Sequence, residues 1–462
     1  MAERPHILIL MADQFRADCL GVAGHPQVQT PSLDRLAQGG VRFAHAVTVN
    51  PLCMPARASF INGLYSHNHG MWDNRSQMPA DDETFFHHLQ AAGYHTGHIG
   101  KSHYHPHGRG HLREAEDYMH ARGLDYVHET TGPWATVTTD SYLTDHWDKL
   151  GLTEVFRADY RDRQAHKEVV RPSPLPVEEY PDSYVGRQAV EFIAGYRREQ
   201  PMALFVGFGG PHEPWDAPGE YATRYPPGET PPPIVPEPPG DWLPEHARAR
   251  MAAGALPLTP EQVARIRGNY YGKISLVDHW IGRILDALAE RGWSEDTLVV
   301  FWSDHGEMAG DHAHLFKSVL YESAVRVPLI LRWPGRAVAG QTSAALAEII
   351  DVFPTLLEAL ELPPSRRCLG RSLLPLLQDP AAPHREASFS EAVTYGKEHI
   401  TMVRTPTHKY VVDEHSRSCH LYDLQADPGE RRNLVGHPGY REIEGELRER
   451  VLAFLLSAQV RR

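Results

Sequence analysis

The chain has 462 residues, of which 41% are hydrophobic and 23% are charged, the composition of a globular protein with a large buried core. Its 46 lysines and arginines are outnumbered by 59 aspartates and glutamates, so the formal net charge is −13. Binding of nucleic acid needs a basic face, so we exclude that class, whereas a locally positive pocket for an anionic substrate is compatible with this charge. The absence of an apolar run of membrane-spanning length predicts no membrane partner.

The first apolar run, at residues 6–11, follows a short polar start and has no cleavage pattern behind it. Because it is too short for a secretion signal, we interpret it as the first core strand and expect a cytoplasmic protein. The four cysteines are widely scattered and form no C-x-x-C pair, so we expect reduced thiols.

Short β-rich runs alternate with helical segments, which predicts an α/β fold with a mostly parallel sheet covered by helices on both faces. Three apolar runs, at residues 6–11, 203–208 and 297–302, each stop abruptly at polar residues. Ligands of open α/β sheets bind outside the carboxyl ends of the strands, so we expect these polar clusters to converge on one site.

Two helices have clear boundaries in the sequence. One begins at Pro31 and ends before Gly39, with proline at the first position and glycine past the end. The other opens with Thr259 and Gln262, spaced as in a capping box, and continues to Gly292.

From about residue 380 the chain changes character. Short strands and a final helix are predicted at residues 399–403, 409–412 and 440–456. We therefore divide the chain into a catalytic domain, residues 1–375, and a C-terminal α+β subdomain, residues 376–462, with a small antiparallel sheet and the terminal helix.

The strongest chemical signal is the stretch CMPAR, from Cys53 to Arg57. Pro55 suits the first turn of a helix, which places Cys53 just before a helix N-terminus, where free amides attract anions. Arg57, one turn further on, adds a positive charge with bidentate reach. Taken alone, the stretch is also compatible with a buried cysteine beside a helix start.

This stretch resembles the sulfatase signature C-x-P-x-R, whose cysteine is converted to formylglycine. A second sulfatase signature matches GYHTGHIGKSH at residues 93–103, in which Ser102 replaces a more usual aromatic residue. Further sulfatase-like features follow in the expected order, at residues 211–214, Lys317, 327–330, 351–355 and 421–424. The chain is therefore identified as a member of the formylglycine-dependent sulfatases of the alkaline phosphatase superfamily, similar to arylsulfatases, choline-sulfatases and phosphonate monoester hydrolases. The resemblance implies an alkaline phosphatase-like fold, a large mostly parallel sheet between helices, with a smaller C-terminal α+β domain.

The resemblance also implies one divalent metal ion. Its ligands would be Asp13, Gln14, Asp304, His305 and an oxygen of the modified Cys53. Taken singly, Asp13 reads as a helix cap and Asp304 as a turn residue. Gln14 stands where a second aspartate is usual, and His305 where asparagine or glutamine is common. These two replacements lower the negative charge of the site and add an imidazole ligand. We therefore expect either manganese or calcium as the bound ion.

As the resemblance implies, one hydroxyl of the hydrated aldehyde attacks the ester, and the second expels the bound group by re-forming the aldehyde. We expect Arg57 to hold the diol, with Lys101 and His103 beside it and His103 as a candidate base. His212 and Lys317 should face the ester and protonate or stabilise the leaving alkoxide. For His103 and Lys317 the alternative is exposure on the surface.

Substrate selectivity is expected near residues 67–74, in the histidine-rich segment 104–128 and in the loop after His212. Trp72 and Trp215 are candidates for stacking on a sugar or aryl group, or for enclosing a quaternary ammonium; packing is the alternative for both. The proline-rich residues 231–239 predict a rigid surface loop, with a role as a lid or interface left open.

We therefore expect a sulfuric ester hydrolase that acts on a small-molecule sulfate monoester after maturation by a formylglycine-generating enzyme. The nearest alternative is a phosphonate monoester or phosphodiester hydrolase with the same nucleophile. A non-catalytic binder of sulfated ligands, with an unmodified Cys53, is a further alternative. A metal-storage protein is excluded because the 29 histidines lack tandem ligand spacing. The sequence leaves homo-oligomer formation open.

Overall fold

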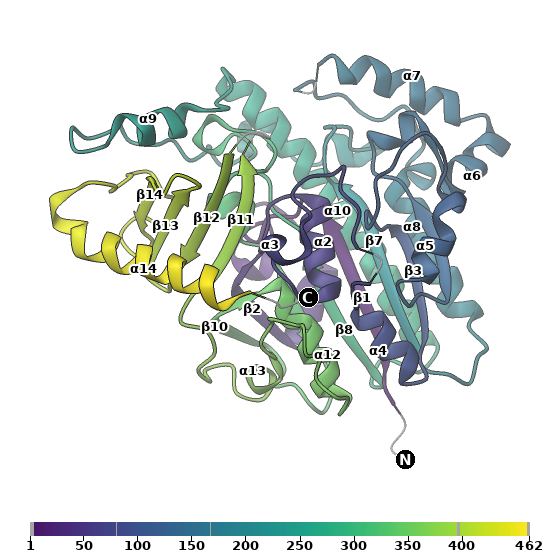
Figure 1. Cartoon of the computed structure of the whole chain (residues 1–462). Helices are drawn as coiled ribbons and strands as arrows, with labels where there is room; N and C mark the ends of the chain where they lie inside the picture. Colours follow the sequence, from purple (N-terminus) through teal and green to yellow (C-terminus); the bar gives the residue numbers. More distant parts are fainter. Residues whose placement is uncertain (1–3, 80, 167, 395–397, 460–462) are drawn as a thin grey trace.

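The protein is described by a computed structural model that covers residues 4–79, 81–166, 168–394 and 398–459. Within these ranges an eight-stranded sheet crosses the molecule and a four-stranded sheet lies beside it (Figure 1). The large sheet has the spatial order β10 (Gln341–Glu348), β2 (Val41–Val47), β9 (Leu329–Arg332), β8 (Thr297–Ser303), β1 (His6–Asp13), β7 (Met202–Pro211), β3 (His95–Lys101), β5 (Tyr126–Thr130). Neighbouring strands are parallel except at β9, which is antiparallel to both β2 and β8. The predicted mostly parallel α/β sheet is confirmed.

Strand β1 lies between β7 and β8 in the middle of this sheet. Ile7 and Ile9 pack into the core on one face, and Leu8 and Leu10 pack into the core on the other. A strand that is buried on both faces needs apolar residues at every position, which explains the continuous run that the sequence shows.

Helices cover both faces of the large sheet (Figure 1). One face packs against α2 (Cys53–Asn62), α4 (Phe85–Ala91) and α12 (Val352–Ala359), the other against α1 (Pro31–Gln38), α8 (Pro181–Gly195) and α10 (Pro260–Glu290). The predicted capping box opens α10: Thr259 Oγ1 accepts from the Gln262 amide at 3.2 Å, and Gln262 Oε1 accepts from the Thr259 amide at 2.8 Å. Both predicted helix starts are confirmed.

The second sheet lies in the C-terminal part of the chain. It is antiparallel, in the order β11 (Ser388–Thr394), β12 (Glu398–Arg404), β13 (His408–Asp413), β14 (Ser418–Asp423), and α14 (Arg441–Ser457) packs along it (Figure 1). The predicted short strands and final helix are confirmed, whereas the boundary between residues 375 and 376 stays a prediction.

The proline-rich stretch, residues 231–239, contains no helix or strand, as predicted. It is attached to the C-terminal part of the chain, because the amide of Glu237 donates to the carbonyl of Arg431 at 2.7 Å. Among the helices of the described ranges, none combines the length and the apolar character that crossing a membrane requires.

Strands β3 and β7 approach each other closely at Gly100 and Gly207. A Cβ atom on Gly100 would meet the carbonyl oxygen of Gly207 and lie 2.9 Å from a methyl group of Val185. Gly100 also has a φ of 96°, a region that residues with side chains avoid. This contact fixes the position of the next residue, Lys101, at the carboxyl end of β3.

The substitution Gly100→Ala should therefore destabilise the protein more than Gly93→Ala does. Gly93 also has a positive φ, 89°, but a Cβ there would meet nothing within 4 Å. Both changes carry the backbone penalty of about 1–2 kcal/mol, and overpacking should add about 1–3 kcal/mol at Gly100 alone. Urea unfolding of both variants measures the difference, and equal losses would contradict the packing argument.

Candidate active site

Side chains from two strand ends and one helix start meet in the middle of the protein. Asp13 ends β1, Asp304 and His305 follow β8, and Cys53 begins α2. The Sγ of Cys53 lies 3.2 Å from Nε2 of His305 and 3.9 Å from Oδ1 of Asp13. The ligand atoms of all four side chains lie within 4.8 Å of one another, and all four side chains are buried.

Helix α2 begins one residue earlier than the sequence predicts. Cys53 is itself the first helical residue, after the extended Leu52, so the expectation that it precedes the helix is wrong by one position. The start of the helix has few free amides: that of Met54 donates to Oδ1 of Asn74 at 3.1 Å, and that of Ala56 donates to the carbonyl of Leu52 at 3.0 Å. The expected attraction of anions by free amides is therefore absent at these two positions. Every residue of α2 is buried, which leaves the helix little freedom to move.

Arg57 joins the two carboxylates of the cluster. Its Nη2 lies 2.9 Å from Oδ2 of Asp13, and its Nε donates to Oδ2 of Asp304 at 2.8 Å. Its Nη1 donates to the carbonyls of Lys101 and Ser102 at 3.0 and 3.2 Å. The Nζ of Lys101 forms a further ion pair with Oδ2 of Asp13. Burial alone would raise the pKa of Asp13, but Lys101 and Arg57 hold it well below its usual value.

The ligand atoms that Arg57 and Lys101 leave unused suit a divalent cation. Both aspartates turn Oδ2 toward the cations and Oδ1 toward His305, whose Nε2 lies 3.8 Å from each Oδ1. Nδ1 of His305 lies 2.9 Å from the carbonyl of Gly306, a contact that favours its N–H there and leaves the Nε2 lone pair facing the aspartates. Because burial lowers the pKa of His305, the ring stays neutral and available as a ligand. Two carboxylates and a neutral imidazole around one point fit a metal ion.

Gln14 lies beside this cluster in a strained conformation, with a φ of 68°. Its amide N–H donates to Oδ1 of Asp304 at 3.0 Å. Its side chain points to a second set of groups: Nε2 donates to Glu213 at 2.8 Å and to Glu307, and Oε1 accepts from Lys317 at 2.5 Å. The structure therefore brings Gln14 to the site but turns its amide oxygen toward Lys317.

Lys317 and His212 form a pair on this side of the site. Lys317 Nζ lies 2.7 Å from His212 Nε2, while His212 Nδ1 lies 2.6 Å from the carbonyl of Glu213. Burial lowers the pKa of Lys317, but Glu213 and Cys53 raise it by more, so the ammonium stays charged. The side chain of Lys317 is only 10% exposed, so the alternative of a surface lysine is wrong.

His103 follows β3 and also has a positive φ, 59°. Its Nδ1 is buried and has no hydrogen-bond partner among the residues that the structure describes. Burial and the neighbouring charge of Lys101 hold its pKa well below the usual value. The ring is therefore neutral and able to accept a proton, and it is not a solvated surface side chain.

Two buried glutamates, Glu213 and Glu307, were not among the predicted site residues. Burial and the negative charge of Glu213 raise the pKa of Glu307 to about 7. Burial also raises the pKa of Glu213, but His212 and Lys317 bring it down to about 2. Oε1 of Glu307 accepts from the amides of Ala309 and Phe316 at 2.8 and 2.7 Å, which holds the loop that carries Lys317. The sequence signal was present, since each glutamate lies just beyond the end of a core strand.

The two tryptophans proposed for substrate contact differ in burial. Trp215 is fully buried, edge-on to Tyr270 and stacked on Phe316, so the expectation that it stacks on a substrate is wrong. Trp72 is half-buried and meets His399 edge-on at 4.5 Å between ring centroids, and its role stays a prediction.

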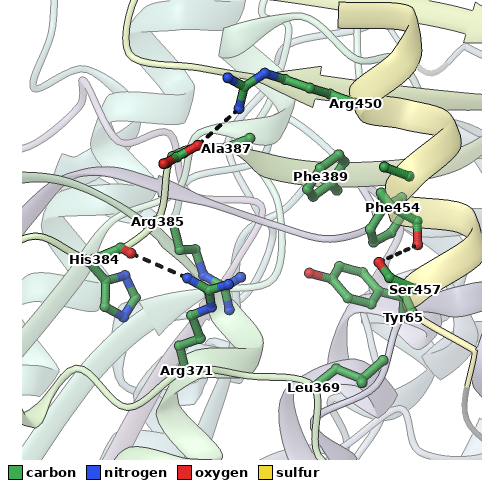
Figure 2. A pocket seen from close by; sticks show the side chains of 13 residues that line it. Tyr65, Leu369, Arg371, His384, Arg385, Ala387, Phe389, Arg450, Phe454 and Ser457 are labelled. Atoms are coloured by element: carbon green, nitrogen blue, oxygen red, sulfur yellow. Dashed lines mark hydrogen bonds and ion pairs between the residues drawn. The ribbon is translucent and has the colours of Figure 1, made fainter.

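A separate cavity of about 510 Å³ lies between α14 and the large domain (Figure 2). Tyr65, Phe389 and Phe454 form part of its wall, and Arg385 and Arg450 point into it. None of the candidate site residues lines it. Arg385 already pairs with Asp351 and Arg450 with Glu386, so these charges have no link to the cluster around Cys53.

Replacing Arg57 by alanine should cost about 3–5 kcal/mol of stability, because two buried carboxylates would lose a partner. The control is Arg35→Ala, which breaks the ion pair between Arg35 and Asp286. Because these two side chains are 58% and 55% exposed, the control should change stability by less than about 0.5 kcal/mol. Guanidinium unfolding in the presence of a chelator measures both. Similar losses for the two variants would contradict the role given to Arg57.

Comparisons with known proteins identify the family of the chain. The family model for sulfatases matches residues 5–362, and the model for the C-terminal region of N-sulphoglucosamine sulphohydrolase matches residues 310–456. The arylsulfatase of Clostridium perfringens is 30% identical, over 96% of this chain and 93% of its own length. The choline-sulfatase of Rhizobium meliloti is also 30% identical, over 94% and 83%.

Solved structures share the fold over the whole length. The phosphonate monoester hydrolase of Agrobacterium radiobacter superposes with a TM-score of 0.80 and 26% identity, covering 98% of this chain and 96% of that one. The predicted alkaline phosphatase-like architecture is thereby confirmed. The protein belongs to the sulfatase family of the alkaline phosphatase superfamily.

Proposed function

We propose that this sulfatase-family enzyme hydrolyses a small-molecule sulfate monoester, with a formylglycine made from Cys53 as the nucleophile and one divalent metal ion beside it. The position of Cys53 carries the proposal, because its Sγ lies 3.2 Å from His305 Nε2 and 3.9 Å from Asp13 Oδ1. In this proposal the sulfur stands in for an oxygen of the modified side chain. An oxygen at this position would be close enough to bind the metal ion that Asp13, Asp304 and His305 would hold.

Hydrated formylglycine supplies two hydroxyl groups on one carbon. One would attack the ester, and the other would release the sulfate that becomes attached to the side chain. An unmodified cysteine or a serine has no second hydroxyl, so water would have to attack the attached sulfate. Cys53 is only 1% exposed in the folded chain. We therefore expect a formylglycine-generating enzyme to modify it before α2 packs into the core.

Asp13, Asp304 and His305 would hold the metal ion, with Gln14 beside them. The ion would neutralise charge on the ester oxygens and lower the pKa of the attacking hydroxyl. The imidazole of His305 favours manganese, and the two aspartates accept calcium equally well. We keep both ions as candidates.

The remaining side chains have chemistry that suits their positions. Arg57 and Lys101 place positive charge beside the nucleophile and would orient it, and the neutral ring of His103 is able to take up its proton. Lys317 and His212, joined at 2.7 Å, would face the leaving oxygen and supply it with a proton.

Mass spectrometry of the tryptic peptide of residues 43–57 tests the nucleophile directly. In active protein we expect the aldehyde at position 53, and Cys53→Ala should abolish turnover while the circular dichroism spectrum stays unchanged. Cys19→Ala is the matched control, since this second buried cysteine lies outside the site and its loss should leave turnover intact. An unmodified thiol in a fully active sample would refute the mechanism. An unmodified thiol in a sample without turnover would instead favour the non-catalytic binder.

A phosphonate monoester or phosphodiester hydrolase with the same nucleophile is the second candidate. The similarity to the phosphonate monoester hydrolase of Agrobacterium radiobacter favours it, at 26% identity over nearly the whole chain. Gln14 and His305 leave room for it, because the lower negative charge of the site suits a monoanionic phosphorus ester as well as a sulfate monoester.

The two candidates separate when kcat/KM for an aryl sulfate, a phosphonate monoester and a phosphodiester is measured on one preparation of known formylglycine content. We expect the aryl sulfate to be preferred. A clear preference for a phosphorus ester would overturn the sulfatase assignment and leave the nucleophile unchanged.

A further inference from the structure

A second cluster of metal-binding side chains lies at the edge of the large sheet, on the segment that follows Lys101. His105 and His107 lie in an irregular stretch between β3 and the short β4 (Gly110–His111). Glu129 lies on the edge strand β5, where it is paired with Gly100 of β3. The cluster contains none of the residues assigned above to the nucleophile, the metal or the ester.

The three side chains are arranged around one point. Nε2 of His105 lies 3.0 Å from Oε2 of Glu129, and Nε2 of His107 lies 3.3 Å from Oε1 of the same carboxylate. One ligand atom from each of the three lies within 4.8 Å of the others. Two ligand atoms that each bind one tetrahedral zinc ion at 2.0–2.1 Å are about 3.3 Å apart. The two separations between imidazole and carboxylate are close to this value.

The cluster is shielded from solvent, and its surroundings favour a bound cation. The side chains of His105, His107 and Glu129 are 8%, 1% and 2% exposed. Nδ1 of His105 lies 3.3 Å from the carbonyl of Pro106, a contact that favours its N–H there and directs the Nε2 lone pair at the carboxylate. A lone pair that faces a buried carboxylate at 3.0 Å is repelled unless a proton or a metal ion lies between them. Nδ1 of His107 is buried without a hydrogen-bond partner within the described part of the chain.

We propose that His105, His107 and Glu129 form a second metal site of this protein, for zinc or a similar transition ion, with water as the fourth ligand. Two imidazoles and one carboxylate are a donor set that zinc accepts. The ion would join the segment after β3 to the edge strand β5. It would also hold Ser102, whose Oγ donates to Glu129, and His103, whose ring lies 4.8 Å from that of His107. The site thereby positions the neutral histidine that we assign to proton transfer.

Zinc counting on the full-length protein tests the proposal. After removal of metals with a chelator, the protein is saturated with Zn²⁺, freed of excess ion, and analysed for zinc per chain by plasma mass spectrometry. We expect the wild-type protein to retain one zinc ion more than His107→Ala. Glu129→Gln, which keeps the shape of the cluster, should bind this ion at least about tenfold more weakly. His111→Ala is the matched control, since this histidine of the same segment pairs with Asp145 and should leave the count unchanged.

Substitution with Co²⁺ gives a second readout. The wild-type protein should show the intense visible absorption of a four-coordinate cobalt site with imidazole ligands, and Glu129→Gln and His107→Ala should lose that component. Zn²⁺ should also raise the thermal midpoint of the wild-type protein more than that of either variant, because a ligand that binds only the folded chain stabilises it. Neither readout depends on turnover, so the proposal can fail while ester hydrolysis stands.

Equal zinc counts and equal cobalt spectra for the wild type and Glu129→Gln would overturn the proposal. The three side chains would then form only a hydrogen-bonded group, in which His105 carries two protons. If His107→Ala does not fold, Glu129→Gln decides the question by itself.

Discussion

The structure depends on one buried group of charges. Asp13 ends β1 and Asp304 follows the neighbouring strand β8, and neither side chain is exposed. Two unpaired carboxylates buried in this way would carry a prohibitive desolvation free energy. Arg57, from α2, forms an ion pair with both of them, and Lys101, from β3, forms one with Asp13. The helix and the three strands β1, β3 and β8 can therefore pack only in the arrangement that places all four charges together. The same arrangement brings Cys53 to the aspartates.

The charge balance of this group explains how an acidic protein can bind an anionic ester. Asp13, Asp304 and the ionised Glu213 are balanced by Arg57, Lys101 and Lys317. A bound divalent ion would therefore make the site positive, although the chain has a formal net charge of −13. Gln14 contributes to this, because its neutral amide stands in place of a carboxylate and accepts a hydrogen bond from Lys317. The site is suited to a tetrahedral anion, whether sulfur or phosphorus is at its centre.

Strain and close packing are concentrated where the chain leaves the core strands. Gln14, after β1, and His103, after β3, both have a positive φ, and Gly100 allows β3 to approach β7. Such conformations persist only when the surrounding structure determines them. Here the constraints are the hydrogen bond from Gln14 to Asp304 and, on the other side, the group of Ser102, His105, His107 and Glu129. Metal ions at the two proposed sites would hold the ends of strands β1, β8 and β3 in these positions.

The sequence by itself determined the main helices and strands and indicated the candidate site residues, because apolar runs, capping patterns and the spacing from Cys53 to Arg57 are local properties of the chain. Only the tertiary structure decided how these residues face one another. It buried Trp215, turned the side chain of Gln14 toward Lys317, and added Glu213 and Glu307 to the site. The physical reason is distance along the chain: Gln14 and Asp304 are 290 residues apart, and their contact results from strand order and packing, which no local pattern encodes.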